Sequence, residues 1–288
     1  MTLSGKSVGD LAKYVAELMK LSSPIALRRL GGGNSSVNFL AETDSGERFL
    51  VKLLPKEKRR RSEKIKIIGR ASGNLLADGC FPSEGGDVFV MRWQEGEPAK
   101  PEDWRGEAIE SFLREYRKLS AVMQKFPESV LQTVPEGTPP GGGQTIHGDL
   151  NWRNVLFEGE EVSGFLDFEM TRRGFAGEDL MRPFAHRYER LGLFAVAKKR
   201  RLLANFEDMV RRSDLPCGEW LEAVEAYRLR KRAVRAKKAK HGILTGINLK
   251  FRETLFKKMR ICVLRAFAFP GKPGGAAVTA KPACGPKQ

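Results

Sequence analysis

Three oxygen-bearing side chains stand at fixed spacing in the middle of the chain. The segment from Ile146 to Phe157 reads IHGDLNWRNVLF, and Asp149 precedes Asn154 by five residues. Asp167 follows Asn154 by thirteen residues, within the segment GFLDFE. Phosphoryl transfer from a nucleotide needs an acidic group that orients the acceptor hydroxyl, and oxygen ligands that hold magnesium on the phosphates. A carboxylate, an amide oxygen and a second carboxylate at these offsets supply that set.

These residues carry a resemblance to a known family. The pattern His-Gly-Asp-x-x-x-x-Asn, followed by a hydrophobic strand that ends in Asp-Phe-Glu, resembles the aminoglycoside phosphotransferase and choline kinase superfamily of small-molecule kinases. The resemblance implies the bilobal protein-kinase fold, with Asp149 as catalytic base and Asn154 and Asp167 as magnesium ligands. Glu169, where protein kinases usually carry glycine, is similar to what small-molecule members show and is predicted as a further metal ligand. Nothing resembles a protein-kinase activation segment, which disfavours a protein substrate.

The first third of the chain agrees with a nucleotide site. A glycine-rich stretch, Leu30 to Ser36, leads into a predicted hairpin with strands over 37–42 and 48–54. Glycines let the backbone approach phosphates closely and expose N–H groups to them. Lys52 resembles the kinase lysine that holds nucleotide phosphates, and residues 88–96 resemble the hinge that binds adenine. The predicted nucleotide-binding residues are Gly31, Gly32, Gly33, Asn34, Ser35, Ser36, Lys52, Glu63, Met91, Arg92 and Trp93.

Two positions depart from the family pattern. The family pairs its lysine with a helix glutamate, and the candidates here are Glu63 and, second, Glu57, next to a run of arginines. Asn151 occupies a position that is often histidine in small-molecule relatives, so the chemistry on the acceptor side can differ. His147 is predicted to hold its loop by hydrogen bonding, and Asp179 to cap or fix a loop. His186 shows no partner pattern and is predicted to be an ordinary residue.

The elements that must position these groups divide into a strand-rich first part and a helical second part. Apolar residues at helical spacing predict helices over 8–21, 62–76 and 104–126, and short apolar runs predict strands at 88–91, 154–157 and 162–168. The fold class predicted is therefore α+β and bilobal, with a small antiparallel-sheet N-lobe and a larger, mainly helical C-lobe. The predicted boundaries are 1–91 for the nucleotide-binding lobe, 92–98 for a hinge, 99–269 for the helical lobe and 270–288 for a disordered tail.

The chain is strongly basic. It carries 51 Lys and Arg against 35 Asp and Glu, a formal charge of +16, which calls for an anionic partner. Residues 228–260 hold thirteen of these cations against one acid, Glu253. Apolar residues interleave with the later charges, so this segment could lie on an anionic membrane, contact an anionic substrate or form a solvated helix face. No stretch is long and apolar enough to span a membrane, and a cytoplasmic protein is expected, with possible contact at the inner face of the membrane.

The sequence therefore predicts an ATP- and Mg²⁺-dependent phosphotransferase acting on a hydroxyl of a small molecule. A cationic aminoglycoside or choline fits a basic chain poorly, which favours an anionic sugar or (lipo)glycan acceptor. The competing prediction is a non-catalytic protein with a kinase fold that binds anionic membrane or nucleic acid through its basic C-terminal helices. The presence of all the metal and base residues disfavours it, and nucleic acid is not the expected partner. The oligomeric state is left open.

Overall fold

The computed structural model of the chain divides into two compact units. It describes residues 5–23, 25–31, 36–55, 59–82, 86–132, 143–192, 194–239 and 247–268. Unit 1 comprises residues 1–94 and 125–130, and unit 2 comprises residues 95–124 and 131–288. The boundary at 94/95 falls within the segment 92–98 that the sequence predicts as a hinge.

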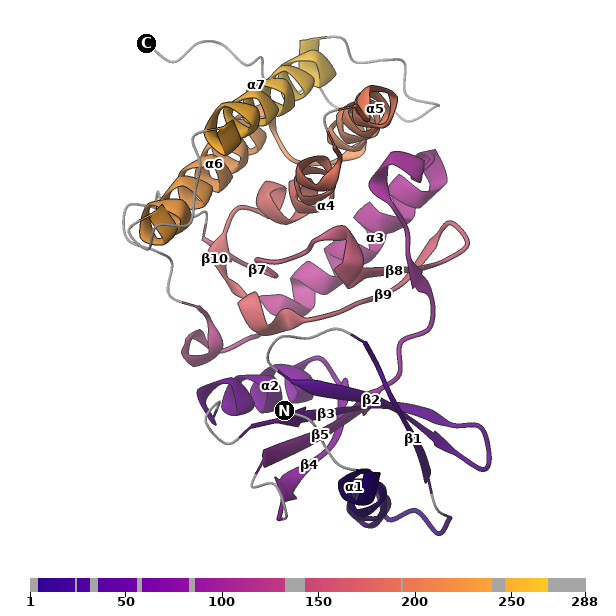
Figure 1. The fold of residues 1–288 in the computed structure, drawn as a ribbon. Coiled ribbons are helices and arrows are strands. Elements are labelled where there is room, and N and C mark those ends of the chain that lie inside the picture. The colour runs from indigo at the N-terminus through magenta and orange to yellow at the C-terminus, as the bar shows by residue number, and fades with distance from the viewer. Residues whose placement is uncertain are drawn as a thin grey trace. The chain divides into compact units, whose positions relative to one another are not determined.

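Unit 1 is built on a five-stranded antiparallel sheet (Figure 1). Its order is β1-β2-β3-β5-β4. The strands are β1 (Ile25–Arg29), β2 (Val37–Thr43), β3 (Arg48–Leu54), β4 (Leu75–Phe81) and β5 (Gly86–Arg92). The predicted hairpin is β2–β3, and its turn closes with a hydrogen bond from the Gly46 amide to the Thr43 carbonyl, at 2.9 Å. Gly46 has a φ of 82°, a conformation that glycine adopts at little cost.

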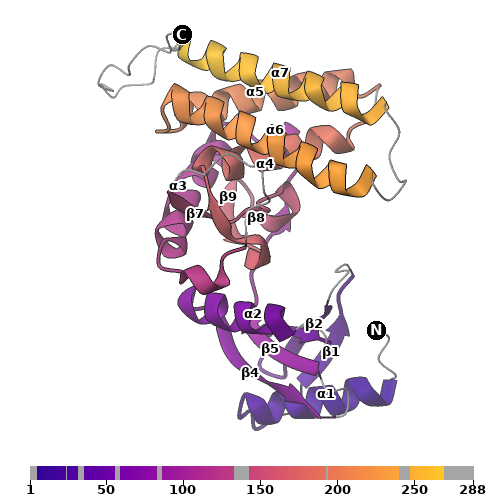
Figure 2. The same cartoon turned by 90° about the vertical axis from the view of Figure 1, so that its left-hand side faces the viewer.

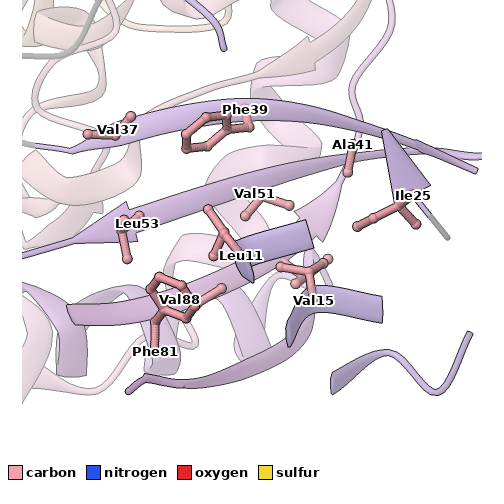
Figure 3. Close-up of a cluster of buried hydrophobic side chains, with 11 residues drawn as sticks. Leu11, Val15, Ile25, Val37, Phe39, Ala41, Val51, Leu53, Phe81 and Val88 are labelled. Atoms are coloured by element: carbon pink, nitrogen blue, oxygen red, sulfur yellow. The ribbon is translucent and has the colours of Figure 1, made fainter. Parts of the chain in front are cut away.

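Alternation of side chains along the strands divides the sheet into two faces. Val51 and Leu53 of β3 point to one face, where they pack against helix α1 (Gly5–Leu18) through Leu11 and Val15 (Figure 3). Leu54 of β3 packs on the opposite face with residues of β5 and of helix α2 (Arg59–Ala71). Parity along β3 therefore places Lys52 on the α2 face, and in the ladder it pairs with Phe89 of β5.

The predicted helix over 62–76 ends earlier in the structure. Helix α2 stops at Ala71, and Gly73, with a φ of 71°, turns the chain back toward the sheet. The amide of Asn74 donates to the carbonyl of Gly69 at 2.9 Å, which satisfies one of the last helical carbonyls. Leu75 then begins β4, a strand that the sequence analysis missed because its apolar residues continue the helical pattern of α2.

Unit 2 is mainly helical, and most of its short strands lie within residues 144–174 (Figures 1 and 2). Helix α3 (Gly106–Met123) packs against β9 (Glu161–Phe165), which pairs with β8 (Val155–Glu158), and β8 pairs in turn with β6 (Glu97–Pro98). A second pair joins β7 (Gln144–Ile146) to β10 (Arg172–Gly174). The remaining helices are α4 (Ala176–Arg190), α5 (Val196–Arg212), α6 (Cys217–Ala239) and α7 (Ile247–Ala268).

The core of unit 2 is aromatic. Trp104 directly follows the 3-10 turn η2 (Pro101–Asp103). Its ring lies 5.0 to 5.3 Å from the rings of Phe112, Phe157 and Phe184, so that α3, β8 and α4 meet at this residue. Phe206 of α5 contacts Phe184 at 5.6 Å and Trp220 of α6 at 5.7 Å. These contacts hold α4 against the strands. Side chains of α4 in turn contact residues 147–149, in the loop that follows β7.

Two further expectations meet the structure in unit 2. The strand predicted over 162–168 ends at Phe165, and residues 168–170 form a 3-10 turn instead. The predicted tail, 270–288, lies outside the described residues. Among the residues that are described, no helix has the length and apolarity needed to cross a bilayer.

Candidate active site

The loop that carries Asp149 is anchored by hydrogen bonds to Asp179, near the start of α4. The carboxylate of Asp179 is buried and accepts hydrogen bonds from the amides of His147 at 2.6 Å and Gly148 at 2.8 Å. The hydroxyl of Tyr116 also donates to it, at 3.3 Å. Burial raises the pKa of Asp179, while His147 and the two amides oppose that rise. Asp179 therefore fixes the loop, as the sequence predicts for it.

His147 is a structural residue of the same loop. Its ring is completely buried, and Nε2 lies 2.8 Å from the carbonyl oxygen of Leu166, the residue before Asp167. The amide of Asp149 lies 3.4 Å from Nδ1, which assigns the proton to Nε2 and makes Nδ1 the acceptor. The ring thus joins the Asp149 loop to the segment that carries Asp167, and it is not exposed for proton transfer.

Gly148 is required by the path of the loop. Its φ is 77°, and a Cβ at this position would lie 2.2 Å from the carbonyl oxygen of Met170. An L side chain would be strained in this conformation and would collide with backbone. The glycine therefore lets the loop pass close to residue 170 and present Asp149 beyond it.

Asn154 and Asp167 are linked to Asp149 by short contacts. The side-chain Nδ2 of Asn154 donates to the backbone carbonyl of Asp149 at 2.9 Å, which leaves its Oδ1 able to accept or to bind a cation. The backbone carbonyl of Asn154 accepts from the amide of Leu166 at 2.9 Å. The structure thus brings together three of the residues that the sequence predicts for chemistry.

Asp167 sits in an unusual backbone conformation. Its φ and ψ are 64° and 61°, in the left-handed region that non-glycine residues seldom adopt and that costs about 1 kcal/mol or more. Its side chain is exposed and makes no hydrogen bond or ion pair with any residue that the structure describes. A carboxylate held at such a cost and left without a protein partner is suited to an external ligand. Glu169, two residues later, is buried instead.

Asp149 itself is gripped by an arginine of α4. Nη2 of Arg182 lies 2.5 Å from Oδ1 of Asp149, and Nη1 of the same guanidinium donates to the Tyr227 hydroxyl at 2.6 Å. Burial would lower the pKa of Arg182, but Tyr227 and Asp149 outweigh it and hold this pKa above its ordinary value. A doubly anchored guanidinium thus fixes one carboxylate oxygen of Asp149.

Sequence analysis did not find Arg182, Tyr227 or His186 as parts of this site. His186 lies one turn after Arg182 on α4, and its pKa is lowered to about 4 by burial and by the charges of Arg182 and Arg190. Its buried Nδ1 has no hydrogen-bond partner among the residues that the structure describes. The spacing of Asp179, Arg182 and His186 at i, i+3 and i+7 puts them on one helix face, and this is the signal that could have found them.

The acids around Asp149 are already occupied by protein groups. Glu178 forms ion pairs with Arg172 and with Arg230 of α6, and its Oε1 accepts from the Phe175 amide at 3.3 Å. Glu189 pairs with Lys231 at 3.4 Å. The carboxylates of α4 therefore serve the fold of unit 2.

The predicted nucleotide-binding residues belong to unit 1. Lys52 is half-buried on the α2 face of the sheet, whereas Glu63 is exposed on α2 and forms no ion pair with a described residue. Glu63 stands two residues before Ile65, which faces the sheet, and is thus rotated by about 200° around the helix. The structure therefore does not bring Glu63 to Lys52, and Glu57 lies outside the described residues.

The other predicted nucleotide-binding residues occupy both ends of the sheet. Gly31 and Ser36 flank the glycine-rich stretch, whose central residues Gly32, Gly33, Asn34 and Ser35 lie outside the described residues. Met91 and Arg92 end β5, and the amide of Arg92 donates to the Asn74 carbonyl at 2.9 Å. The indole Nε1 of Trp93 is buried, and no described residue accepts a hydrogen bond from it.

A comparison with protein-family models matches residues 97–215 to the phosphotransferase enzyme family. This range contains Asp149, Asn154, Asp167, Asp179 and Arg182. A comparison with curated protein sequences finds no match.

Solved structures of small-molecule kinases resemble most of the chain. A thermostable mutant of the aminoglycoside phosphotransferase APH(4)-Ia, in a ternary complex with AMP-PNP and hygromycin B, is 14% identical, with 89% of this chain and 98% of that chain covered and a TM-score of 0.52. An amicoumacin kinase in complex with AMP-PNP and Ca²⁺ is 9% identical, with 82% and 88% covered and a TM-score of 0.52. A choline/ethanolamine kinase family protein from Mesorhizobium loti is 16% identical, with 88% and 94% covered and a TM-score of 0.49.

The two similar structures with a TM-score of 0.52 confirm the predicted fold class, an α+β fold with a small antiparallel-sheet unit and a larger helical unit. They also confirm the predicted resemblance. Residues 97–215 match the phosphotransferase enzyme family, and the fold of the chain is similar to those of an aminoglycoside phosphotransferase and an amicoumacin kinase.

Proposed function

We propose that this chain transfers a phosphoryl group from ATP to a hydroxyl of a small molecule, with Asp149 as the base that orients that hydroxyl. The observation that carries the proposal is the assembly in unit 2 of Asp149, Asn154 and Asp167, joined by hydrogen bonds through Asn154 and Leu166. The phosphotransferase family model over the same segment supports it. AMP-PNP in the similar structures supports a nucleotide donor.

Asp149 is arranged to receive the acceptor proton. Arg182 occupies its Oδ1, so that Oδ2 is the oxygen left to accept a hydrogen bond from the acceptor hydroxyl. The Arg182 contact limits rotation of the carboxylate, and a fixed acceptor geometry is the main contribution a protein makes to phosphoryl transfer. Asp179 and His147 hold the backbone of the same loop.

Asn154 and Asp167 fit a magnesium ion. Mg²⁺ prefers oxygen ligands and is usually held by one or two carboxylates together with substrate phosphates. Oδ1 of Asn154 and the carboxylate of Asp167, neither of which has a hydrogen-bond partner among the described residues, provide such a pair. The described residues contain no larger cluster of His, Cys, Asp or Glu. When bound, the ion neutralises charge on the phosphates. Glu169 remains a proposed ligand whose burial makes it the least accessible of the three.

Lys52 and the glycine-rich stretch that ends at Ser36 are the proposed phosphate-binding groups of unit 1. Lys52 reaches the α2 face from a strand that is pinned on both sides, by Asn38 of β2 and Phe89 of β5. Residues Met91 to Trp93 are the proposed adenine contacts. Their backbone groups follow directly from the end of β5.

An anionic acceptor, such as an acidic or phosphorylated sugar or glycan, is the proposed substrate class. A cationic drug would need free carboxylates near Asp149, and the carboxylates of α4 are paired with Arg172, Arg230 and Lys231 or with backbone amides. Arg153, in the loop itself, is exposed, and its guanidinium lies 5.3 Å from the centre of the Trp152 ring. Such a surrounding favours a negatively charged molecule.

The test is Mg-ATP turnover over a panel of neutral, anionic and cationic sugars and glycolipids, with Asp149→Ala and Asp167→Ala as variants. We expect wild-type turnover with an anionic sugar and losses of at least 100-fold in each variant. The phosphotransferase proposal fails if wild type neither binds nor turns over Mg-ATP, or if both variants retain full activity. A preference for cationic aminoglycosides would refute only the acceptor class.

A further inference from the structure

The basic segment predicted to contact a membrane, 228–260, is largely used inside the fold. The interleaved apolar residues Leu255, Phe256 and Met259 are buried in unit 2. Arg228 pairs with Glu225 at 2.6 Å and Lys231 with Glu189 at 3.4 Å, and Arg230 pairs with buried Glu178. The earlier apolar residues Ile243 and Leu244 lie outside the described residues. The described part of this segment therefore does not form a membrane-binding amphipathic face by itself.

A different segment exposes apolar and basic side chains together. Phe194, in the turn between α4 and α5, is 99% exposed, and Val196, the first residue of α5, is 60% exposed. The turn is closed by a hydrogen bond from the Ala195 amide to the Gly192 carbonyl, at 3.2 Å. Exposed Arg200 follows one turn after Val196 on the same side of α5, and it forms no ion pair with a described residue.

Helix α7 extends this arrangement, because it runs along α5 (Figure 2). Sγ of Cys262 lies 3.7 Å from the Leu203 carbonyl oxygen. Lys199 of α5 and Lys258 of α7 lie 5.3 and 5.9 Å from the centre of the Tyr188 ring. Burial and, second, the charge of Lys258 lower the pKa of Lys199, because the two ammonium groups lie close to the same ring.

The exposed side of α7 repeats the pattern. Ile261 is 47% exposed and Leu264 is 40% exposed, and both stand out from a helix whose other large apolar residues in this stretch are mostly buried. Exposed Lys257 and Arg265 lie on the same side, one turn from them, and form no ion pair within the described residues. From Thr254 to the end of the chain the sequence contains no acidic residue.

We propose that this α5–α7 surface, defined by Phe194, Val196, Arg200, Lys257, Ile261 and Leu264, docks on an anionic phospholipid bilayer. Two properties of the surface favour a bilayer over nucleic acid as its anionic partner. A fully exposed phenylalanine gains free energy only where it can leave water, which the interfacial region of a bilayer provides and a phosphate backbone does not. The adjacent unpaired cations complement anionic headgroups, and single scattered apolar residues without such charges would need no explanation.

Docking of this kind is independent of phosphoryl transfer and is tested without nucleotide. The full chain is sedimented with vesicles of phosphatidylcholine containing about one quarter phosphatidylglycerol, and with pure phosphatidylcholine vesicles. We expect binding to the anionic vesicles only, weakening with added salt. Phe194→Ser should lower the partition coefficient about tenfold, and Phe194→Trp should retain it.

Charge variants separate this surface from general attraction. Neutralising one lysine or arginine near a membrane costs about fivefold in binding, so Arg200→Gln with Lys257→Gln should cost roughly 25-fold. The matched control is Arg117→Gln with Lys118→Gln, which removes the same charge from exposed positions on α3. That control should retain at least half of the binding. All these positions are exposed, so thermal unfolding should be unchanged.

Three outcomes would overturn the proposal. The first is no binding to anionic vesicles. The second is an equal loss of vesicle binding in the double charge variant of the docking surface and in the α3 control, and the third is full binding by Phe194→Ser. Binding to duplex DNA that is stronger than vesicle binding and insensitive to Phe194→Ser would assign the surface to nucleic acid and overturn it too. None of these results bears on whether wild type turns over Mg-ATP.

Discussion

Replacement of Arg182 by methionine tests whether the guanidinium positions Asp149 or only stabilises unit 2. The variant removes two short hydrogen bonds, to Asp149 Oδ1 at 2.5 Å and to the Tyr227 hydroxyl at 2.6 Å, while keeping a similar apolar stem. Hydrogen bonds to charged groups contribute about 1.5–3 kcal/mol each. The side chain of Asp149 is 27% exposed, so water replaces part of the loss. We therefore expect a destabilisation of about 2–4 kcal/mol.

The catalytic effect should exceed what lost stability explains. An Asp149 carboxylate that can rotate or shift by about 1 Å should lower kcat by about 100-fold. The KM for nucleotide should change little, because the hydrogen bonds of Arg182 go to Asp149 and Tyr227 and not to the proposed nucleotide or metal ligands. Arg182→Lys, which keeps the charge but not the fork, should recover part of kcat. Steady-state kinetics on folded protein, with thermal unfolding in parallel, measure both effects.

Helix α4 offers a matched control in Arg187. Its guanidinium pairs with buried Glu102 at 2.8 Å and 2.5 Å, so Arg187→Met also breaks a buried bidentate ion pair of α4. This variant should lower the unfolding temperature to a similar extent and leave kcat within about threefold of wild type. The positioning argument is refuted if Arg182→Met, assayed well below its unfolding temperature, matches Arg187→Met in kcat.

Three further predictions follow from the same geometry. Asp179→Ala should cost about 2–4 kcal/mol in urea unfolding, because it leaves the amides of His147 and Gly148 unpaired; a cost below 1 kcal/mol would contradict the loop-fixing role. The pKa of His186 is about 4 against an ordinary 6.5, so the unfolded state binds the extra proton between these values. Stability should thus fall by about 2 kcal/mol as the pH drops from 6.5 to 4, a value discounted for partial exposure, and His186→Gln should remove that fall. Lys52→Met should raise the KM for ATP at least tenfold while Glu63→Gln does not; equal effects in a nucleotide-binding assay would show that Glu63 reaches Lys52 after all.

Prediction from sequence succeeded where chemistry and local pattern coincide. The offsets between Asp149, Asn154 and Asp167 act over one loop and one short hairpin, so their proximity follows from the hairpin pairing of β8 with β9. The β2–β3 hairpin was predicted for the same reason, because alternation and a glycine turn are local signals. Strand β4 was missed, since its first residues also continue the helical spacing of α2.

The pairing of Lys52 with Glu63 shows how local reasoning reaches its limit. Sequence separation placed Glu63 in the helix that follows β3, which is correct. The face that Glu63 occupies depends on which apolar residues of α2 the sheet buries, and Ile65 and Ile68 are buried. A rotation of the helix by one residue, about 100°, would have changed the outcome.

The amino-acid sequence by itself determined the candidate reacting groups, the glycine positions and the excess of positive charge. Tertiary structure decided which charged side chains form ion pairs within the fold. Arg182 reaches Asp149 across 33 positions, and Arg230 is paired with Glu178 from another helix. Such partners come from helix packing, which buries apolar faces and brings distant side chains together whatever their spacing in the chain. The same packing buries the apolar residues of the basic segment and leaves Phe194 exposed.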